Sequence, residues 1–408
     1  MGKKGIYISV LCFIPLLLIG QEGCTDPLAN NFSPTAIVND GSCTYDLSSY
    51  TPQEITGLSS PLLNENSGLV YFNESIWTIN DGGNANSVYQ LDTLGNLIRE
   101  IVITNAQNTD WEAISHNNTH LFIGDFGNNS GSRQNLCIYS IDKQEIQDTS
   151  LTETQAIKRF FTYEDQTEFS WSTNGHNYDC EAFIAKEDSL YLFSKNWLDE
   201  YTKVYCLPVL WTDTALAILK DSLFVDGLIT DASIDNDSGN IMLLGYKNNG
   251  GNLYTSFVWM LWDYFGTDYF TGNKRRIEIG SMFIVGQTEG ICMINATNGY
   301  ISSEQISSII TIDPKLLKFD FAQYITNNTA SLLEIYSEPE LYVYPNPAAE
   351  KLKLEGHGEC YWIYSFSSKS LVINGFLLEN EIDISGLKPG MYLLCSGGLS
   401  RRFIRSKD

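Results

Sequence analysis

The chain has 408 residues, of which 43% are hydrophobic and 18% charged, so it can bury a large core and exceeds the length of one typical domain. Asp and Glu number 49 against 25 Lys and Arg, which gives a formal net charge of −24 at pH 7. Such an acidic surface repels phosphate backbones and anionic headgroups, which argues against nucleic acid and membrane surfaces as partners and favours divalent cations.

The first 20 residues have the pattern of an export signal. Lys3 and Lys4 form a short basic region, an apolar stretch runs from Ile6 to Ile19, and polar residues follow Gly20. The apolar stretch is short for a bilayer, so we expect a removed signal peptide over 1–20, a secreted protein and no transmembrane span in the mature chain. A membrane anchor is the alternative.

Residues 21–49 form a cysteine-bounded N-terminal segment. Export places the cysteines after residue 20 in a compartment where disulfides persist. Cys24 and Cys43 enclose a polar, turn-rich stretch that cannot build a core of its own, so we predict that they pair. The stretch resembles a small module near the start of secreted bacterial surface proteins, which implies no activity. A calcium ion is the alternative to a metal-free segment, since oxygen ligands are present at Asp26, Asn39 and Asp40.

Residues 50–336 are predicted to form a β-propeller. A carboxylate at a strand start, a second strand, a Gly/Asn-rich loop and a Tyr-rich third strand recur along this stretch. Units of about 40–50 residues with this order are typical of propeller blades. The fold class that we predict is all-β, a six-bladed β-propeller followed by a small C-terminal β-sandwich, with five or seven blades as the nearest alternatives. A pair of two-layer sandwiches would not explain the recurrence.

Three motifs in the first two repeats carry a family resemblance. Asn80–Gly83, Thr109–Ala113 and Gly124–Asn129, with Arg133, resemble bacterial six-bladed propellers of the phytase-like, esterase-like and SdiA-regulated groups. The resemblance implies calcium-dependent phosphate-ester hydrolysis in some members and no established activity in many others. A dense set of Lys and Arg residues for binding phosphate is missing, which weakens the phytase interpretation.

Residues 337–408 are less acidic and consist of short alternating strands separated by Gly and Pro turns, as in a small antiparallel sandwich. The resemblance here is to a type A C-terminal sorting domain of the type IX secretion system. It implies the type IX secretion machinery as a partner and an extracellular or cell-surface location. The matching motifs are Val343–Ala348, Leu352–Leu354, Ile384–Leu387, Pro389–Leu393 and Arg401–Arg405.

The repeated carboxylates supply a candidate metal site. The first strands of propeller blades line the channel, so carboxylates at equivalent strand starts converge on one mouth. Asp110 and Asp179 lie two residues before Glu112 and Glu181, on the same side of an extended strand. Like charges this close raise each other's pKa unless a cation or an arginine neutralises them, and calcium suits a set of carboxylate and amide oxygens. The predicted metal ligands at strand starts and in the loops after second strands are Glu65, Asp81, Glu112, Asp125, Glu181, Asp231 and Glu289.

His176 is the candidate general base that would act on a calcium-bound water. These residues together predict a calcium-dependent ester or phosphoester hydrolase. The alternative is a non-enzymatic extracellular propeller that binds a glycan, a peptide or a surface partner. In that case His176 is a surface loop residue, and the carboxylates cap backbone amides of neighbouring blades.

The aromatic residues and the remaining cysteines are less specific. Trp77, Trp111, Trp171 and Trp197 suit either sugar stacking or packing between blades. The remaining cysteines are either buried thiols or further disulfides, and their pairing stays open: Cys137, Cys180, Cys206, Cys292, Cys360 and Cys395.

Overall fold

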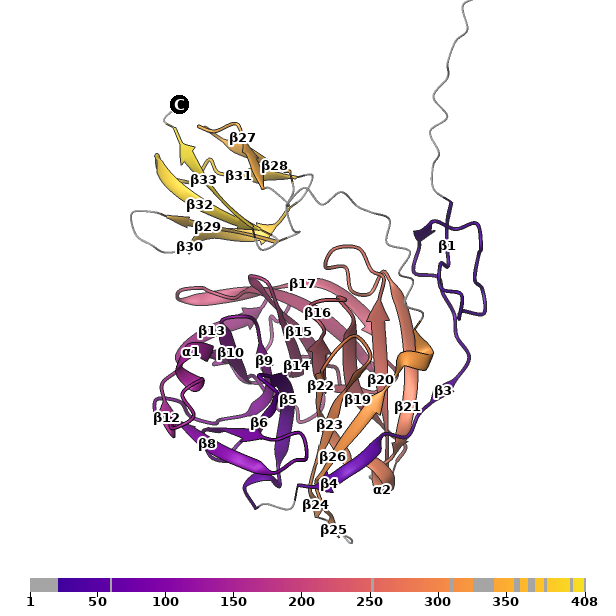
Figure 1. Cartoon of the computed structure of the whole chain (residues 1–408). Coiled ribbons are helices and arrows are strands. Elements are labelled where there is room, and N and C mark those ends of the chain that lie inside the picture. Colours follow the sequence, from indigo (N-terminus) through magenta and orange to yellow (C-terminus); the bar gives the residue numbers. More distant parts are fainter. Residues whose placement is uncertain are drawn as a thin grey trace, which may run out of the picture.

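The structure is a computed structural model of the chain (Figure 1). It describes residues 21–58, 61–250, 253–307, 311–325, 341–355, 360–365, 371–377, 380–396 and 399–406. The predicted signal peptide and the boundary near residues 337–340 lie outside the described residues. Within them, no helix has both the length and the apolar character that a membrane crossing requires.

Five four-stranded antiparallel units form the main body. The first four have these strands, from the innermost outward. Blade 1 contains β5 (Asn66–Phe72), β6 (Ser75–Asn80), β7 (Ser87–Leu91) and β8 (Leu97–Ile103). Blade 2 contains β9 (Trp111–His116), β10 (His120–Asp125), β11 (Cys137–Asp142) and β13 (Ile157–Tyr163). Blade 3 contains β14 (Asp179–Lys186), β15 (Ser189–Lys195), β16 (Tyr201–Pro208) and β17 (Thr214–Phe224). Blade 4 contains β18 (Leu228–Ile234), β19 (Ile241–Asn248), β20 (Tyr254–Trp262) and β21 (Asn273–Ser281).

Blade 5 joins the two ends of the propeller. Its inner strands are β22 (Gln287–Met293), β23 (Asn298–Glu304) and β26 (Lys315–Asp320), and its outermost strand is β4 (Gln53–Gly57), which precedes blade 1 in the chain. The innermost strands contact one another in the order β5, β9, β14, β18, β22 and back to β5, so the ring is closed.

The prediction of an all-β propeller followed by a sandwich is confirmed, but the blades number five, not six. The length expected for a sixth blade lies in insertions. Blade 2 contains α1 (Lys143–Ile146) and β12 (Glu153–Thr154), and long connections cover 164–178 and 263–272. The repeat over 288–302, which is degenerate in sequence, is a full blade because β4 completes it.

Smaller elements lie at the edges. β3 (Ser48–Ser49) pairs in parallel with β21, and β13 pairs in parallel with β17, which joins blades 2 and 3 into one eight-stranded sheet. The N-terminal segment contains β1 (Glu22–Gly23) and β2 (Val38–Asn39) and is closed by the predicted disulfide, which is present between Cys24 and Cys43. The other short elements are η1 (Pro61–Leu63), α2 (Met282–Val285), β24 (Ile306–Ser307), β25 (Thr311–Ile312) and η2 (Ala322–Tyr324).

The burial of each strand follows its place in the blade. Second strands such as β15 are buried along their whole length, because neighbouring blades cover both faces of the sheet. This explains continuous apolar runs such as 190–193. The outermost strand β17 begins with alternating exposed and buried residues, since one of its faces meets solvent. The cysteines at 137, 180, 206 and 292 are free and buried in these layers, and in the C-terminal domain Cys360 is buried and Cys395 is partly buried.

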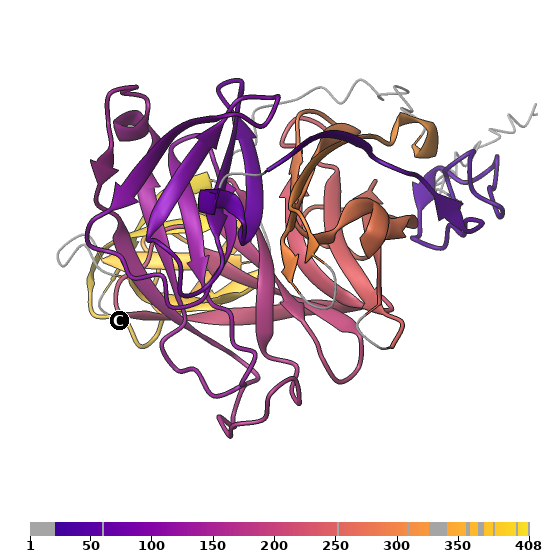
Figure 2. The ribbon, with the colours of Figure 1, turned by 90° about the horizontal axis from the view of Figure 1, so that it is seen from below.

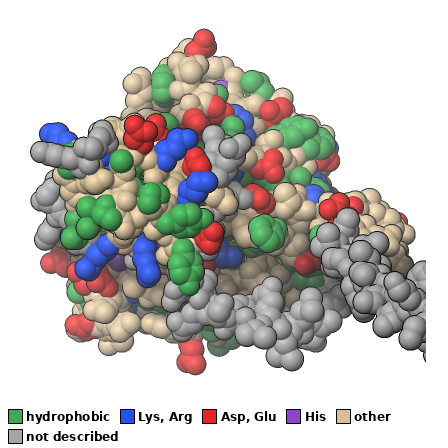
Figure 3. All heavy atoms as spheres, turned by 90° about the horizontal axis from the view of Figure 1, so that it is seen from above, with side chains coloured by type: hydrophobic (Ala, Val, Ile, Leu, Met, Phe, Trp, Pro, Cys, Tyr) green, Lys and Arg blue, Asp and Glu red, His purple; other side chains and the backbone are tan. Residues whose placement is uncertain are grey.

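The C-terminal domain is the expected sandwich. One sheet contains β27 (Tyr342–Tyr344), β28 (Lys351–Glu355) and β31 (Glu381–Asp383). The other contains β29 (Cys360–Ser365), β30 (Leu371–Phe376), β32 (Gly390–Ser396) and β33 (Leu399–Arg405). Trp362 packs in one buried cluster with propeller residues, and the Tyr364 hydroxyl donates to the Leu210 carbonyl at 2.6 Å. Figure 3 views the molecule from this side, where Lys and Arg side chains lie among hydrophobic ones.

Candidate functional site

A β-bulge recurs near the start of every innermost strand. The residue that the register skips is Gly68 in β5, Glu112 in β9, Glu181 in β14, Thr230 in β18 and Glu289 in β22. A bulge interrupts the alternation of the strand and redirects a side chain. In three of the five blades the residue at this position is a glutamate, so the repeat brings three carboxyl groups to the same end of the channel.

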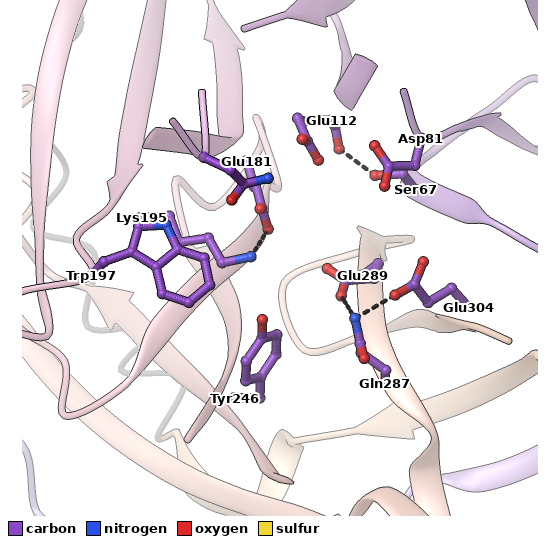
Figure 4. Close-up of a pocket in the computed structure, with 11 residues that line it drawn as sticks. Ser67, Asp81, Glu112, Glu181, Lys195, Trp197, Tyr246, Gln287, Glu289 and Glu304 are labelled. Carbon is purple, nitrogen blue, oxygen red and sulfur yellow. Dashed lines mark hydrogen bonds and ion pairs between the residues drawn. The ribbon is translucent and has the colours of Figure 1, made fainter. Parts of the chain in front are cut away.

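These glutamates converge on a cavity of about 200 Å³ (Figure 4). The ends of the second strands supply most of the other lining groups, because in a hairpin the second strand ends where the first begins. The lining residues are Ser67, Asp81, Glu112, Asn129, Glu181, Lys195, Trp197, Tyr246, Gln287, Glu289 and Glu304.

One wall of the cavity, from blades 1 and 2, is a group of three carboxyl groups. One ligand oxygen from each of Asp81, Asp110 and Glu112 lies within 4.8 Å of the other two. Glu112 is only 6% exposed, and its carboxylate has no hydrogen-bond or ion-pair partner among the described residues. Gly127 allows the close approach, because a Cβ there would lie 2.2 Å from Glu112 Oε1 and 2.6 Å from Asp110 Oδ2. An unpartnered buried carboxylate in such a cradle fits a cation.

The electrostatics of this wall support the same conclusion. Burial, followed by the charge of Asp81, raises the pKa of Asp110 to about 6 and that of Glu112 well above its usual range. Burial also raises the pKa of Asp81. Arg133 lies 3.7 Å from Asp110, but its guanidinium is held by Asp125 at 2.7 Å. The group therefore has little protein charge to balance it.

The neighbouring wall, from blade 3, contains its own cation. Lys195 Nζ forms a buried ion pair with Glu181 and lies 5.0 Å from the centroid of the Trp197 ring and 5.3 Å from that of Tyr246. Burial alone would lower the pKa of Lys195, but Glu181 together with the other acidic groups around it, Tyr246, Glu289 and Asp179, outweighs burial, and the pKa is raised well above its ordinary value. Lys195 is thus held as an ammonium and pairs with Glu181, although burial still raises the pKa of Glu181 above its usual range.

Blade 5 supplies a third set of groups. The Gln287 side-chain amide donates to Glu289 Oε1 at 2.8 Å and also to Glu304 Oε1. Burial, then the charge of Glu304, raises the pKa of Glu289 to about 8. Burial, then the charge of Asp81, raises the pKa of Glu304 to about 8 as well. Both groups hold a proton at neutral pH in the absence of a cation.

Four of the seven predicted ligands, Asp81, Glu112, Glu181 and Glu289, are brought together around the cavity. Their metal-binding role stays a prediction. For the other three, the expectation of one shared ring requires correction, because the structure places each of them elsewhere.

Asp231 lies one residue after the bulge of its strand, and a one-residue offset turns a side chain to the other face. Its carboxylate accepts hydrogen bonds from the backbone N–H groups of Leu69, Ala232 and Ile291, and so links blades 1, 4 and 5.

Asp125 and Glu65 also lie outside the cavity lining. Asp125 is buried and accepts a hydrogen bond from the Arg133 guanidinium at 2.7 Å. Glu65 is exposed and accepts one from the Asn84 side chain at 2.6 Å.

His176 does not line the cavity either. Its Nε2 lies 3.2 Å from the Asn129 carbonyl oxygen, and its Nδ1 accepts from the Tyr178 backbone N–H at 3.0 Å. With both nitrogens held by backbone groups, the ring has no free lone pair with which to take a proton from water. We therefore assign His176 a structural position in this loop and do not use it as a general base.

Lys195, Gln287 and Glu304 were missed from the sequence. A signal was present for two of them. Lys195 and Glu304 are the last residues of second strands, and the predicted ligands Asp81 and Asp125 stand at the equivalent point of the first two blades. Trp197 is in the lining and donates through Nε1 to Asp179 Oδ2 at 2.8 Å, whereas Trp77 and Trp111 are core residues.

No protein-family model and no curated protein sequence matches the chain. Among solved structures, the catalytic domain of Coprinopsis cinerea GH62 alpha-L-arabinofuranosidase is 9% identical with a TM-score of 0.37, over 67% of this chain and 98% of that one. The GH43_1 enzyme from Xanthomonas citri is 13% identical with a TM-score of 0.33, over 68% and 93%. MPT-4, a mannose phosphorylase from Leishmania mexicana, is 10% identical with a TM-score of 0.38, over 67% and 89%. Likenesses at this level carry no argument about the chemistry of the site.

Proposed function

We propose that the protein is a secreted, calcium-dependent hydrolase whose reaction takes place in the cavity at the propeller mouth. The observation that carries the proposal is the group formed by Asp81, Asp110 and Glu112, in which a buried carboxylate has no partner among the described residues. Calcium is a hard cation that takes carboxylate and amide oxygens, and the Asn129 side chain lines the same cavity. When bound, it would polarise a substrate oxygen and lower the pKa of a water molecule.

The charge of the cavity favours an uncharged substrate. Five carboxyl groups line it, and the sole Lys or Arg among the described lining residues, Lys195, is paired with Glu181. With Glu289 and Glu304 protonated, the argument against a phosphate group is that the described lining residues include no free cationic side chain to bind it. A carboxylic ester or a lactone is therefore the substrate class that we propose, in preference to a phosphoester.

Glu289 and Glu304 are the groups best placed to transfer protons. Their raised pKa values, both about 8, lie near a neutral working pH, where proton transfer by a side chain is most effective. Gln287 fixes the orientation of both carboxyl groups. In the hydrolysis, a water oxygen bonds to the acyl carbon and the bond from the acyl carbon to the alcohol oxygen breaks. That oxygen receives a proton from one of the two glutamic acids, and the proton that the water loses restores this acid.

The location of the protein is part of the proposal. The N-terminal pattern over 1–20 and the C-terminal motifs after residue 337 support export, with the type IX secretion machinery as the partner. Removal of 337–408 is expected to abolish the appearance of the protein in the medium of the native host. Appearance of the truncated protein at wild-type levels would contradict this part of the proposal.

Calcium titration tests the site directly. Calcium at one hundred times its Kd is expected to stabilise the wild type by about 2.7 kcal/mol, and a chelator to reverse this. In Glu112→Gln, the increase in Tm with calcium and the hydrolysis of aryl esters and lactones should both be lost. Glu153→Gln removes an exposed carboxylate outside the cavity lining and serves as the matched control, which should keep both.

The outcomes separate the competing functions. An unchanged Tm with calcium and chelator, together with full activity of Glu112→Gln, would overturn the calcium site. A calcium-dependent Tm that Glu112→Gln abolishes, with no turnover of esters, lactones, phosphoesters or glycosides, would establish the non-enzymatic binding propeller instead.

A further inference from the structure

The connection between blades 2 and 3, residues 164–178, is an ordered loop at the rim of the cavity. It contains no helix or strand, and stretches of this length without secondary structure are uncommon in compact domains and usually functional. Its backbone bonds to the blade 2 loop that contains the cavity-lining Asn129. Ser172 N–H donates to the Ser130 carbonyl and Asn174 N–H to the Asn129 carbonyl, both at 2.9 Å. Figure 2 shows loops of the purple and magenta part of the chain projecting beyond the sheets.

The loop is also fastened to blade 3, beside Trp197. The Trp197 N–H donates to the His176 carbonyl at 3.3 Å, and the Leu198 N–H donates to Asn177 Oδ1 at 3.0 Å. The His176 ring packs over Gly131, where a Cβ would lie 2.6 Å from the ring. Hydrogen bonds on both sides therefore hold the loop in one conformation next to two lining residues, Asn129 and Trp197.

This fastened loop holds a large aromatic side chain in water. Trp171 is 76% exposed, and Leu198 on the adjoining rim is 65% exposed. Burying an indole is worth a few kcal/mol, so a loop that is ordered by so many hydrogen bonds and yet leaves its tryptophan exposed is not optimised for stability alone. An exposed indole in a loop that is fastened to two cavity-lining residues offers a flat apolar face to a ligand that reaches the cavity.

We propose that Trp171 forms an outer carbohydrate-binding subsite, which stacks on one sugar ring of a chain whose next unit enters the carboxylate cavity. A sugar ring presents C–H groups on its faces and hydroxyl groups around its edge. The indole of Trp171 can stack on the C–H face of the ring, and the carboxylate and amide oxygens of the cavity can accept hydrogen bonds from the hydroxyl groups. The inference names the carbohydrate class of the substrate and rests on the proposed function only for the reaction, since stacking requires no turnover.

The test measures binding on the full chain. Soluble xylan, arabinan, mannan and laminarin are used as probes, by retardation in polysaccharide-containing native gels and by tryptophan fluorescence. At least one probe should retard the wild type, Trp171→Ala should weaken binding about tenfold, and Trp171→Phe should retain most of it. Phe265→Ala is the matched control. It removes an aromatic residue that is 87% exposed in the loop between β20 and β21, at the other end of the blades.

Several results would overturn the inference. One is that no polysaccharide probe retards the wild type. Another is that Trp171→Ala, with an unchanged Tm, binds as well as the wild type. A third is that tetramethylammonium quenches the tryptophan fluorescence and the polysaccharides do not. Failure of the two proposals is distinguishable. Polysaccharide binding without any hydrolysis supports the subsite and removes the hydrolase, whereas hydrolysis of simple esters without polysaccharide binding does the reverse.

Discussion

The two walls of the cavity solve the same electrostatic problem in different ways. On the blade 3 wall, Glu181 is neutralised from within the protein by Lys195, which two aromatic rings enclose. On the wall from blades 1 and 2, Asp81, Asp110 and Glu112 approach one another without a comparable cation. The first wall is complete as it stands. The second requires either protons or an external ion, so it is there that we place the calcium-binding function.

Asp231 extends the comparison to a third carboxyl group. It is as buried as Glu112, but its oxygens accept three backbone N–H groups from three blades. Burial together with satisfied hydrogen bonds indicates a structural carboxylate, and burial without them indicates a binding one. Substitutions at the Lys195–Glu181 pair, at Asp231 and at Glu112 should therefore change the free energy of unfolding by different amounts.

The largest effect is expected for Lys195→Met. Removing one partner of a buried ion pair leaves the other charge uncompensated, which costs about 3–5 kcal/mol. Urea unfolding at pH 7 measures the loss, and Lys195→Met with Glu181→Gln should recover most of it. Lys203→Met breaks the more exposed ion pair with Asp165 and should cost less than about 1 kcal/mol. Equal losses for the two lysines would contradict the contrast between the walls.

A smaller loss is expected for Asp231→Asn. The amide nitrogen of asparagine cannot accept the N–H groups that a carboxylate oxygen accepts, so the variant should lose about 1–3 kcal/mol of unfolding free energy. The same urea titration measures it. Asp237→Asn, at an exposed position in the following turn, is the control and should behave as the wild type. A stability equal to that of the control would show that the links between blades contribute nothing.

The pH dependence of stability reports on Glu289 and Glu304. Their pKa values of about 8 lie above those of the unfolded chain, so between pH 5 and 8 the native state keeps protons that the unfolded state releases. The free energy of unfolding in chelator should thus fall as pH rises, by up to about 1.4 kcal/mol per pH unit for each group. Glu304→Gln should make the fall less steep. Stability that rises over this interval would contradict the prediction.

The smallest effect is expected for Glu112→Gln in the absence of calcium. No hydrogen bond or ion pair of the described residues is lost, and burial already favours the uncharged form of this carboxyl group, so stability should change by less than about 1 kcal/mol. Differential scanning calorimetry in chelator measures it. A large loss would mean that Glu112 is a structural carboxylate like Asp231.

The sequence predicted the propeller and part of the cavity because both depend on local periodicity. Glu112, Glu181 and Glu289 are recognisable as equivalent residues in successive repeats, and the Cys24–Cys43 pair is close in sequence. Blade number was less accessible, because insertions such as 164–178 lengthen blades without adding strands. The fifth blade was also hidden, since its outer strand β4 comes from before the first.

Single side chains depend on register to within one residue. Asp231 precedes an alanine as Glu112 and Glu181 do, yet the bulge in its strand falls at Thr230, and this displacement turns Asp231 from the cavity toward backbone amides. The repeated carboxylates at strand starts do not indicate Lys195, Gln287 or Glu304, because the first two are not carboxylates and Glu304 lies at the end of its strand. His176 is polar and lies near the site in sequence, but which atoms its ring nitrogens contact depends on tertiary structure alone.

The pairing of β4 with β26 makes the assembly of the cavity an all-or-nothing event. Blade 5 supplies Gln287, Glu289 and Glu304, yet its sheet is incomplete until a segment near residue 55 meets one near residue 316. A chain that has not yet brought its two distant ends together has no finished pocket, whatever the state of the blades between them. A complete cavity should therefore form late in folding, and removal of β4 should destabilise blade 5 although β4 is the outermost strand of that blade.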